Sequence, residues 1–250
     1  MLPIRDNIPT TRTTYVTYGL IVANVLVYFL WQQGGLSFGS PDGAHYNCQL
    51  QDWAAVPREI LNPATPVPYG PALADGCRPE NVSPYLTVFT AMFMHGGLLH
   101  LGGNMLFLWI FGNNVEDAMG PVKFIGFYLL AGISALALQI VFDPSSQVPT
   151  LGASGAIAGV LGGYLLLFPK ARVVTVIFIV FFFTLLELPA LVVLGLWFLQ
   201  QAVFAAMDIG GSGGGVAYFA HVGGFVFGLA AIRLFASRTR VDDQLDRAGV

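Results

Sequence analysis

Six long apolar runs divide the chain, and they constrain its fold more than any other feature. The sequence is 55% hydrophobic and only 10% charged, whereas soluble domains carry about 25% charged residues. A helix needs about 20 apolar residues to cross a membrane. The runs therefore predict an all-α polytopic membrane protein, a bundle of six transmembrane helices at residues 15–31, 86–111, 121–142, 152–168, 190–207 and 216–236.

The fifth run, Val173 to Met207, is too long for one crossing. Glu187-Leu188-Pro189 interrupts it, and a proline inside a helical pattern bends or ends the helix. We predict one crossing at 190–207, preceded by an apolar segment that lies in the membrane interface or re-enters the membrane. Two short spans are the alternative, and they would give seven crossings.

The basic residues predict the orientation. With six crossings and both termini cytoplasmic, nine of the eleven Lys and Arg residues fall on the cytoplasmic side, and only Arg58 and Arg78 do not. We therefore predict cytoplasmic tails at 1–14 and 237–250, an extracytoplasmic loop at 32–84 and a location in the plasma membrane. The basic residues are scattered along the chain, so no nucleic-acid partner is indicated.

The loop 32–84 is long for a simple connection. Its apolar patch Trp53-Ala54-Ala55-Val56 predicts partial order against the membrane surface. Cys48 and Cys77 both lie in this loop, and a disulfide between them is plausible in an oxidising compartment. The sequence alone leaves that pairing open.

Conspicuous polar residues converge at one depth of this topology. Ser154 lies two residues into the fourth span, within Leu151–Val160, where glycines flank it, and His221 lies near the outer end of the sixth span. His95, His100 and Asn104 lie in the outer half of the second span. All five are therefore predicted in the same outer leaflet.

Small residues follow both Ser154 and His221 at helical spacing. Gly155 heads a stripe on the fourth span, and Gly224 and Gly228 follow His221 on the sixth. Such stripes let membrane helices approach closely, which would bring His221 within the reach of a general base for Ser154. The alternative is that both stripes serve helix packing only.

His100 and Asn104 are four residues apart and share one helix face. With the backbone N–H of Ser154 they could stabilise an oxyanion, or they could form a hydrogen-bonded clamp between helices. A metal site of His95, His100 and His221 would lack a carboxylate, and we predict none. No aspartate is placed to orient His221, so aromatic or backbone contacts should hold its ring.

Three motifs match one known family in spacing, order and topology: His95-x4-His100-x3-Asn104, Gly152-x-Ser154-Gly155, and Ala220-His221-x2-Gly224-x3-Gly228. On these motifs the chain resembles the rhomboid intramembrane serine proteases across residues 15–236. It resembles a prokaryotic-type six-span member, with no further span or large soluble domain.

The resemblance implies a serine endopeptidase that cleaves transmembrane segments of other membrane proteins without a cofactor. Ser154 would be the nucleophile and His221 its base, with no third triad member. His100, Asn104 and the Ser154 N–H would bind the oxyanion, while His95 and the motif glycines support them. Glu116 would be a structural acid, residues 210–215 a cap over the site, and the fifth span the element that moves to admit substrate.

Two departures from the family pattern concern the first loop. The Trp-Arg pair that many members carry is absent, because the corresponding stretch Tyr85–Thr90 reads YLTVFT, and the loop is longer than in compact bacterial forms.

The rival function is a catalytically silent relative that binds membrane proteins for quality control. A channel or transporter would also need polar groups in the inner halves of the spans. Apart from Glu116, the inner halves of the second, fourth and sixth spans hold almost no polar residues. The sequence does not indicate the oligomeric state or the substrate.

Overall fold

The computed structural model of the chain describes residues 1–39, 41, 43–65, 67, 80, 82–179, 182–209 and 216–249. The expected cap, residues 210–215, and Cys77 lie outside these described residues.

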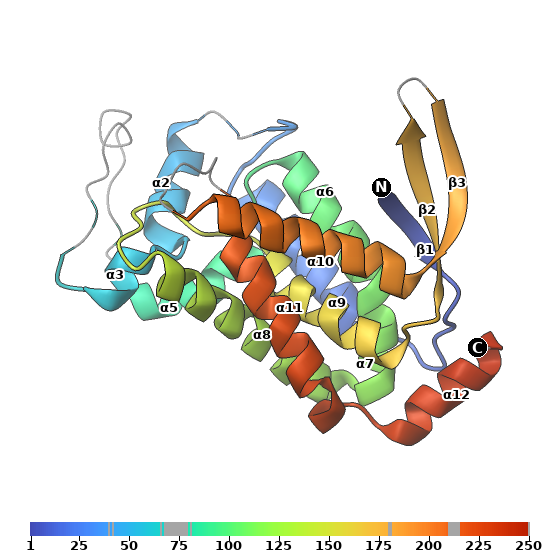
Figure 1. The fold of residues 1–250 in the computed structure, drawn as a ribbon. Coiled ribbons are helices and arrows are strands. Elements are labelled where there is room, and N and C mark those ends of the chain that lie inside the picture. Colours follow the sequence, from blue (N-terminus) through green and yellow to red (C-terminus); the bar gives the residue numbers. More distant parts are fainter. Residues whose placement is uncertain are drawn as a thin grey trace.

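The described chain is mostly helical and carries one antiparallel three-stranded sheet of order β1-β2-β3 (Figure 1). Its elements in chain order are β1 (Leu2–Asp6), α1 (Tyr15–Leu26), η1 (Val27–Trp31), α2 (Ala44–Trp53), α3 (Pro57–Leu61), α5 (Pro84–Thr90), η2 (Ala91–Phe93), α6 (Leu98–Phe107), η3 (Leu108–Gly112), α7 (Asn113–Met119), α8 (Pro121–Phe142), α9 (Ser154–Leu167), β2 (Arg172–Ile179), β3 (Phe182–Pro189), α10 (Ala190–Met207), α11 (Tyr218–Phe235) and α12 (Arg238–Ala248).

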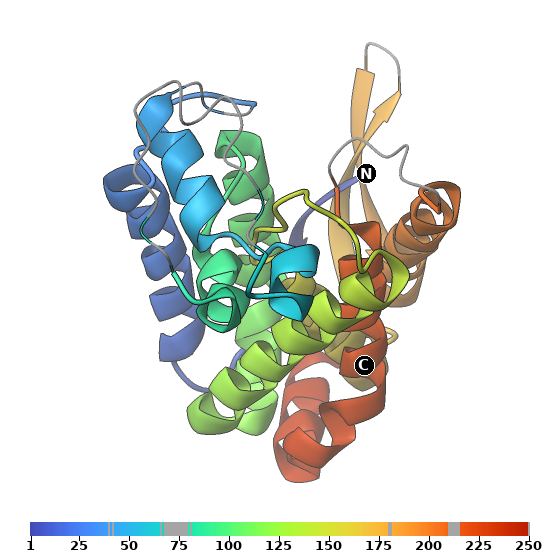
Figure 2. The ribbon, with the colours of Figure 1, turned by 90° about the vertical axis from the view of Figure 1, so that its left-hand side faces the viewer.

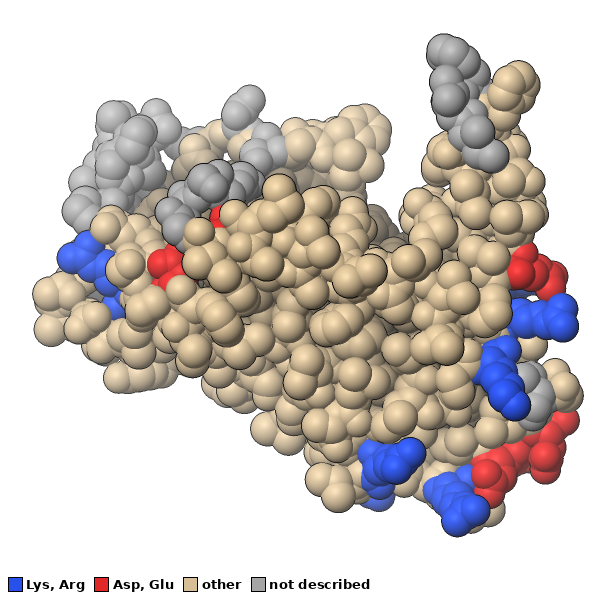
Figure 3. All heavy atoms as spheres, in the orientation of Figure 1, with Lys and Arg blue, Asp and Glu red and all other residues tan. Residues whose placement is uncertain are grey.

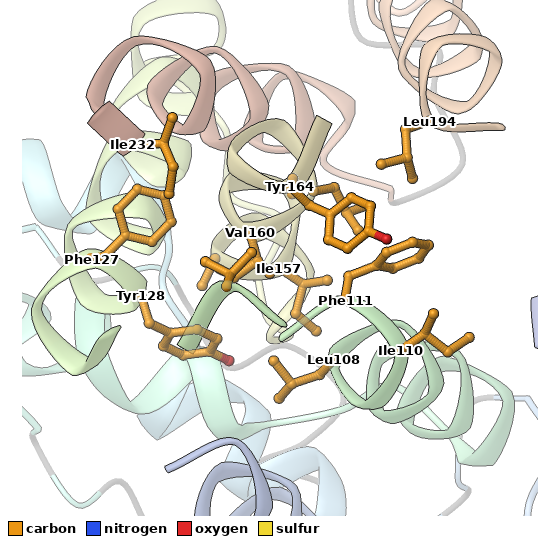
Figure 4. Close-up of a cluster of buried hydrophobic side chains, with 14 of the residues drawn as sticks. Leu108, Ile110, Phe111, Phe127, Tyr128, Ile157, Val160, Tyr164, Leu194 and Ile232 are labelled. Atoms are coloured by element: carbon orange, nitrogen blue, oxygen red, sulfur yellow. The ribbon is translucent and has the colours of Figure 1, made fainter. Parts of the chain in front are cut away.

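Helix α9 lies at the centre of the bundle. Side chains from α8, η3, α10 and α11 pack around it (Figure 4), and every residue from Ala156 to Tyr164 is buried. Glycines and alanines make this possible, because they let surrounding helices approach on several sides. Helices α1 and α10 lie on opposite sides of the bundle (Figure 2).

Helices α9 and α11 meet backbone to backbone. A Cβ added at Gly224 would lie 2.0 Å from the carbonyl oxygen of Gly155, and one at Gly228 would lie 2.0 Å from that of Gly159. Neither position accepts a side chain unless the helices move apart. The close approach that the two glycine stripes predict is therefore present.

Three of the described helices, α8, α10 and α11, are long and apolar enough to cross a membrane. The apolar helices at Tyr15–Trp31, Pro84–Phe93 and Ser154–Leu167 are shorter. Six crossings therefore stay a prediction, although α8 and α10 begin and end at the residues predicted for spans three and five.

The predicted second span is not continuous: α5 and η2 are helical through Phe93, and a break separates them from α6. The chain leaves the helical conformation at residues 94–97, and α6 begins only at Leu98. Gly97 has φ +144°, and a Cβ there would lie 2.1 Å from the carbonyl oxygen of Gly39. His95 consequently lies in the break, before the helix that carries His100 and Asn104.

The segment before α10 is a β-hairpin, β2–β3, so the all-α class needs correction, whereas the interfacial or re-entrant position of this segment stays a prediction. Residues 173–177 read VVTVI, and β-branched residues favour strands. The strand conformation could not be predicted from apolarity alone, because a short apolar run fits a strand or a helix equally well. The hairpin exposes Phe178, Phe182 and Phe183, while Arg172 and Glu187 form an exposed ion pair of 3.7 Å at its base.

Much of the predicted long loop is ordered, as its apolar patch suggested. Ala54, Ala55 and Val56 are buried, and Ala55 exchanges two backbone hydrogen bonds with Thr150, in the segment just before α9. The Thr90 hydroxyl donates to the carbonyl oxygen of Trp53 at 2.8 Å, which ties the loop to α5 without a Trp-Arg pair. Cys48 is disulfide-bonded.

Helix α7 gathers both chain termini at one end of the molecule, which we call the terminal end. The Glu116 carboxylate accepts hydrogen bonds from the N–H groups of Val16 and Thr17 and from the Thr17 hydroxyl, at 3.0, 2.7 and 2.7 Å. It thereby caps the first turn of α1, where N–H groups lack helical acceptors. Gln244 of α12 donates to the Asn114 carbonyl oxygen. The predicted tails therefore contain a paired strand and a docked helix.

The Asp6 carboxylate belongs to the same end and is largely buried. It accepts hydrogen bonds from the Tyr164 hydroxyl and the Asn114 amide. Burial raises the pKa of Asp6 from 3.8 to about 6, although the Tyr164 hydrogen bond and backbone N–H groups oppose the shift.

We expect this carboxyl to make stability depend on pH. Between pH 3.8 and about 6 the folded protein keeps the Asp6 proton that the unfolded chain releases, so stability falls as the pH rises through this window. Asp6→Asn does not titrate, so the melting temperature of the wild type in detergent should fall relative to Asp6→Asn from pH 4 to pH 6. Asp242→Asn, at an exposed position of α12, controls for net charge. Parallel curves for the wild type and Asp6→Asn would contradict the prediction.

Candidate active site

Ser154 and His221 meet where α9 and α11 begin. The distance between Ser154 Oγ and His221 Nε2 is 2.8 Å. Ser154 is the first residue of α9, and His221 lies in the first turn of α11. The glycine contacts below them fix this distance, because main chain rather than flexible side chains separates the two helices.

His221 has a second polar partner that the sequence did not single out. Its Nδ1 lies 2.8 Å from Oε1 of Gln201 on α10, and Gln201 is buried. The indole of Trp197, one turn earlier on α10, lies 6.0 Å from the imidazole between ring centroids. The predicted aromatic contacts to the ring are therefore present, but the prediction missed the side-chain amide of Gln201. A glutamine inside an apolar span was the available signal, because polar residues in spans are costly.

These two contacts define the tautomer of His221. An amide oxygen only accepts hydrogen bonds, so we assign the ring proton to Nδ1. Nε2 then carries the lone pair and accepts the hydroxyl hydrogen of Ser154. This is the protonation state in which an imidazole can act as general base.

A cavity of about 600 Å³ opens beside this pair. Ser154, His221, His100, Asn104 and Gln201 all line it, together with backbone and apolar side chains from α5, α6, α8 and the segment before α9. The cavity therefore brings together residues from α2, α5, α6, α8, α9, α10 and α11, and it holds space for an extended peptide segment next to the serine.

His100 and Asn104 both present donors to this cavity. Nδ1 of His100 accepts a hydrogen bond from the Gly96 N–H at 3.2 Å, which leaves the proton on Nε2. The Nδ2 amide of Asn104 is buried with no hydrogen-bond partner among the described residues. Since α9 begins at Ser154, the N–H of Ser154 also lacks a helical acceptor. These groups can hold a negatively charged oxygen.

Gly152 shapes the space between His100 and Ser154. Its φ is +118°, and a Cβ there would lie 2.8 Å from Nε2 of His100 and 3.5 Å from Oγ of Ser154. Any side chain at this position would fill the space between His100 and Ser154.

His95 stands behind the site instead of lining its cavity. Its backbone exchanges hydrogen bonds with the side-chain amide of Gln32 and accepts one from the Tyr46 hydroxyl. Its buried ring packs edge-on against that of His100, at 5.1 Å between centroids, and neither ring nitrogen has a partner among the described residues. His95 therefore lies against the ring of His100, and its supporting role stays a prediction.

The described residues contain no group of three His, Cys, Asp or Glu side chains that could hold a metal ion. What the fold and site define is thus a mostly helical membrane protein with a hydrogen-bonded serine and histidine near the start of two tightly packed helices.

The chain belongs to the rhomboid family. The model of the rhomboid domain matches residues 83–238, more than half of the chain. Rhomboid protein 1, mitochondrial, of Saccharomyces cerevisiae is 30% identical over 156 residues, which are 60% of this chain and 42% of that protein. The human presenilin-associated rhomboid-like protein, mitochondrial, is 28% identical over 216 residues, 84% and 46% of the two chains. Rhomboid protease GluP of Bacillus subtilis is 42% identical over 78 residues, 31% and 15% of the two chains.

The chain spans less than half the length of each of these relatives. Two of the three are named as mitochondrial proteins. They support a membrane location but not the plasma membrane that the sequence predicted.

Proposed function

We propose that the protein is an intramembrane serine endopeptidase that cleaves transmembrane segments of other membrane proteins. One observation carries the proposal, the 2.8 Å hydrogen bond between Ser154 Oγ and His221 Nε2 beside a cavity large enough for a peptide. Family membership and the printed name of the relative GluP as a protease support it.

In the proposed mechanism His221 removes the hydroxyl proton as Ser154 Oγ attacks the scissile carbonyl carbon. Collapse of the tetrahedral intermediate breaks the C–N bond, and the imidazolium gives its proton to the leaving amine. A water molecule then attacks the acyl-enzyme with His221 again as base, and Ser154 is regenerated. The chemistry needs no cofactor.

Three donors would stabilise the oxyanion: Nε2–H of His100, the Asn104 amide and the Ser154 N–H. The free Asn104 amide supports this role, because a buried donor without a partner is costly unless a ligand supplies an acceptor. It argues against the alternative of a hydrogen-bonded clamp between helices.

The orientation follows from the charges. Most of the basic residues visible in Figure 3 lie at the terminal end, whereas Tyr46 and Leu50 of α2, away from that end, line the cavity. If basic residues face the cytoplasm, the site faces the extracytoplasmic side, and both termini are cytoplasmic.

Labelling with a fluorophosphonate probe tests the proposal. The detergent-solubilised wild type should form a covalent adduct, and peptide mapping by mass spectrometry should place it on Ser154. Heat-denatured protein should not label. Labelling elsewhere, or none combined with an intact model transmembrane substrate, would favour the catalytically silent binding function.

Asn104→Ala should lower kcat for a transmembrane substrate by about 10²-fold, because removing one oxyanion donor typically costs this much. The melting temperature should change little, because the amide has no partner to lose. Asn113→Ala, on the same chain segment but outside the cavity-lining residues, is the matched control. Unchanged kcat in Asn104→Ala would remove Asn104 from the proposed oxyanion site.

A further inference from the structure

Helix α10 supplies a residue to the chemistry of the site. We propose that Gln201 is a positioning residue: its Oε1 holds Nδ1–H of His221, so that Nε2 faces Ser154 as the proton acceptor. The inference rests on the proposed function and adds a third member, a side-chain amide, to the pair.

The geometry is that of a hydrogen-bonded chain from Gln201 through His221 to Ser154. Both of its links are 2.8 Å long, and Gln201 is only 8% exposed. In such buried surroundings a hydrogen bond fixes ring orientation and tautomer more strongly than it would in water. Without the acceptor at Nδ1, the neutral imidazole can carry its proton on Nε2. A protonated Nε2 has no free lone pair and cannot accept the proton of Ser154.

The other contacts of the ring do not replace this one. Trp197 and Tyr218 contact the imidazole at 6.0 and 6.5 Å between centroids, tilted and edge-on respectively. Aromatic contacts restrict the plane of the ring but do not distinguish its two nitrogens. Among the described residues that contact His221, only Gln201 selects the tautomer of its ring.

Gln201 also makes the pair depend on the position of α10. Over an apolar stretch of 18 residues, 28% of the residues of α10 are buried, whereas 44% are buried in α8 and 39% in α11. Trp197 and Gln201 are one helical turn apart and place one face of α10 against His221. A displacement of this part of α10 breaks the hydrogen bond to His221, so the base is correctly set only while α10 is docked.

The test compares Gln201→Met, which keeps size and loses the acceptor, with Gln201→Glu, which keeps an acceptor at the same reach. Gln200→Met, at the adjacent exposed position, is the matched control. For each variant the second-order rate of fluorophosphonate labelling and the kcat and KM for a model transmembrane substrate are measured, with the melting temperature as a check of folding.

We expect Gln201→Met to slow labelling by about tenfold or more, the equivalent of one hydrogen bond. It should lower kcat by a similar factor with little change in KM, because the small probe and the large substrate both need the base. Gln201→Glu should restore both rates to within a few-fold of the wild type, and Gln200→Met should match the wild type.

Labelling of Gln201→Met at the rate of Gln200→Met overturns the inference. So does a loss confined to the transmembrane substrate, because this would assign Gln201 to substrate entry. If Gln201→Met is unstable, its labelling rate is divided by the amount of folded protein and compared with that of Gln201→Glu. A Gln201→Glu variant that is stable but labels no faster than Gln201→Met on this basis also overturns the inference. A wild type that neither labels nor cleaves overturns the proposed function itself, which is a different result.

Discussion

Ser154→Ala and His221→Ala are each expected to reduce cleavage of a transmembrane substrate by at least about 10³-fold, to background. Loss of either partner removes the nucleophile or the base, and such residues act as one unit, so their effects do not add. The double variant should therefore be no slower than either single variant. Cleavage is measured by gel in detergent and in reconstituted vesicles.

Ser134→Ala, on α8, and His45→Ala, in the loop before the site, are matched controls and should keep wild-type rates. Neither lines the cavity among the residues that the structure describes. A Ser154→Ala variant that still cleaves would place the chemistry elsewhere. A double variant much slower than both single ones would show that the two residues act independently.

Gly228→Ala is expected to be the most damaging small change to the fold. The added Cβ would lie 2.0 Å from the Gly159 carbonyl oxygen and 2.9 Å from the Gly163 nitrogen. Both are main-chain atoms that no rotamer can move, so α9 and α11 must separate. Overpacking of this kind costs about 1–3 kcal/mol or more, and the separation also stretches the Ser154–His221 hydrogen bond.

We expect Gly228→Ala to lower the melting temperature clearly and to lose most labelling of Ser154. The matched control is Gly126→Ala on α8, where an added Cβ meets nothing within 4 Å. There alanine should stabilise the helix slightly, because it favours helix by about 1 kcal/mol over glycine. Equal melting temperatures for the two variants would mean that α9 and α11 tolerate separation.

Sequence reasoning located the candidate site because its signals are local and of few kinds. A serine between glycines, a histidine above a glycine stripe and a His–Asn pair at helical spacing each stand out in an apolar chain. The structure places Ser154 and His221 in hydrogen-bond contact and shows the glycine contacts that bring them there. It also places His100 and Asn104 on the shared cavity. Their catalytic roles stay proposals.

The features that could not be predicted from the sequence depend on contacts between residues far apart in the chain. Gln200 and Gln201 are adjacent amides in a long apolar run, and only the packing of α10 on α11 brings Gln201 to His221. The strands of the β2–β3 hairpin were not predicted because their apolar residues do not alternate with polar ones. The break at His95 depends on the close approach of residue 39 to Gly97, a contact across 58 positions that no local pattern encodes.

The role of α7 as an anchor for both termini sets the order in which the chain can assemble. The cap of α1 comes from Glu116, about a hundred residues later, and β1 pairs with β2 at residues 173–176. The C-terminal helix reaches back across 130 positions to Asn114. During synthesis α1 therefore stays uncapped until Glu116 has been made, and β1 stays unpaired until residues 173–176 have been made. The terminal end closes only after α12 has been made, because Gln244 of α12 docks on Asn114 of α7 there.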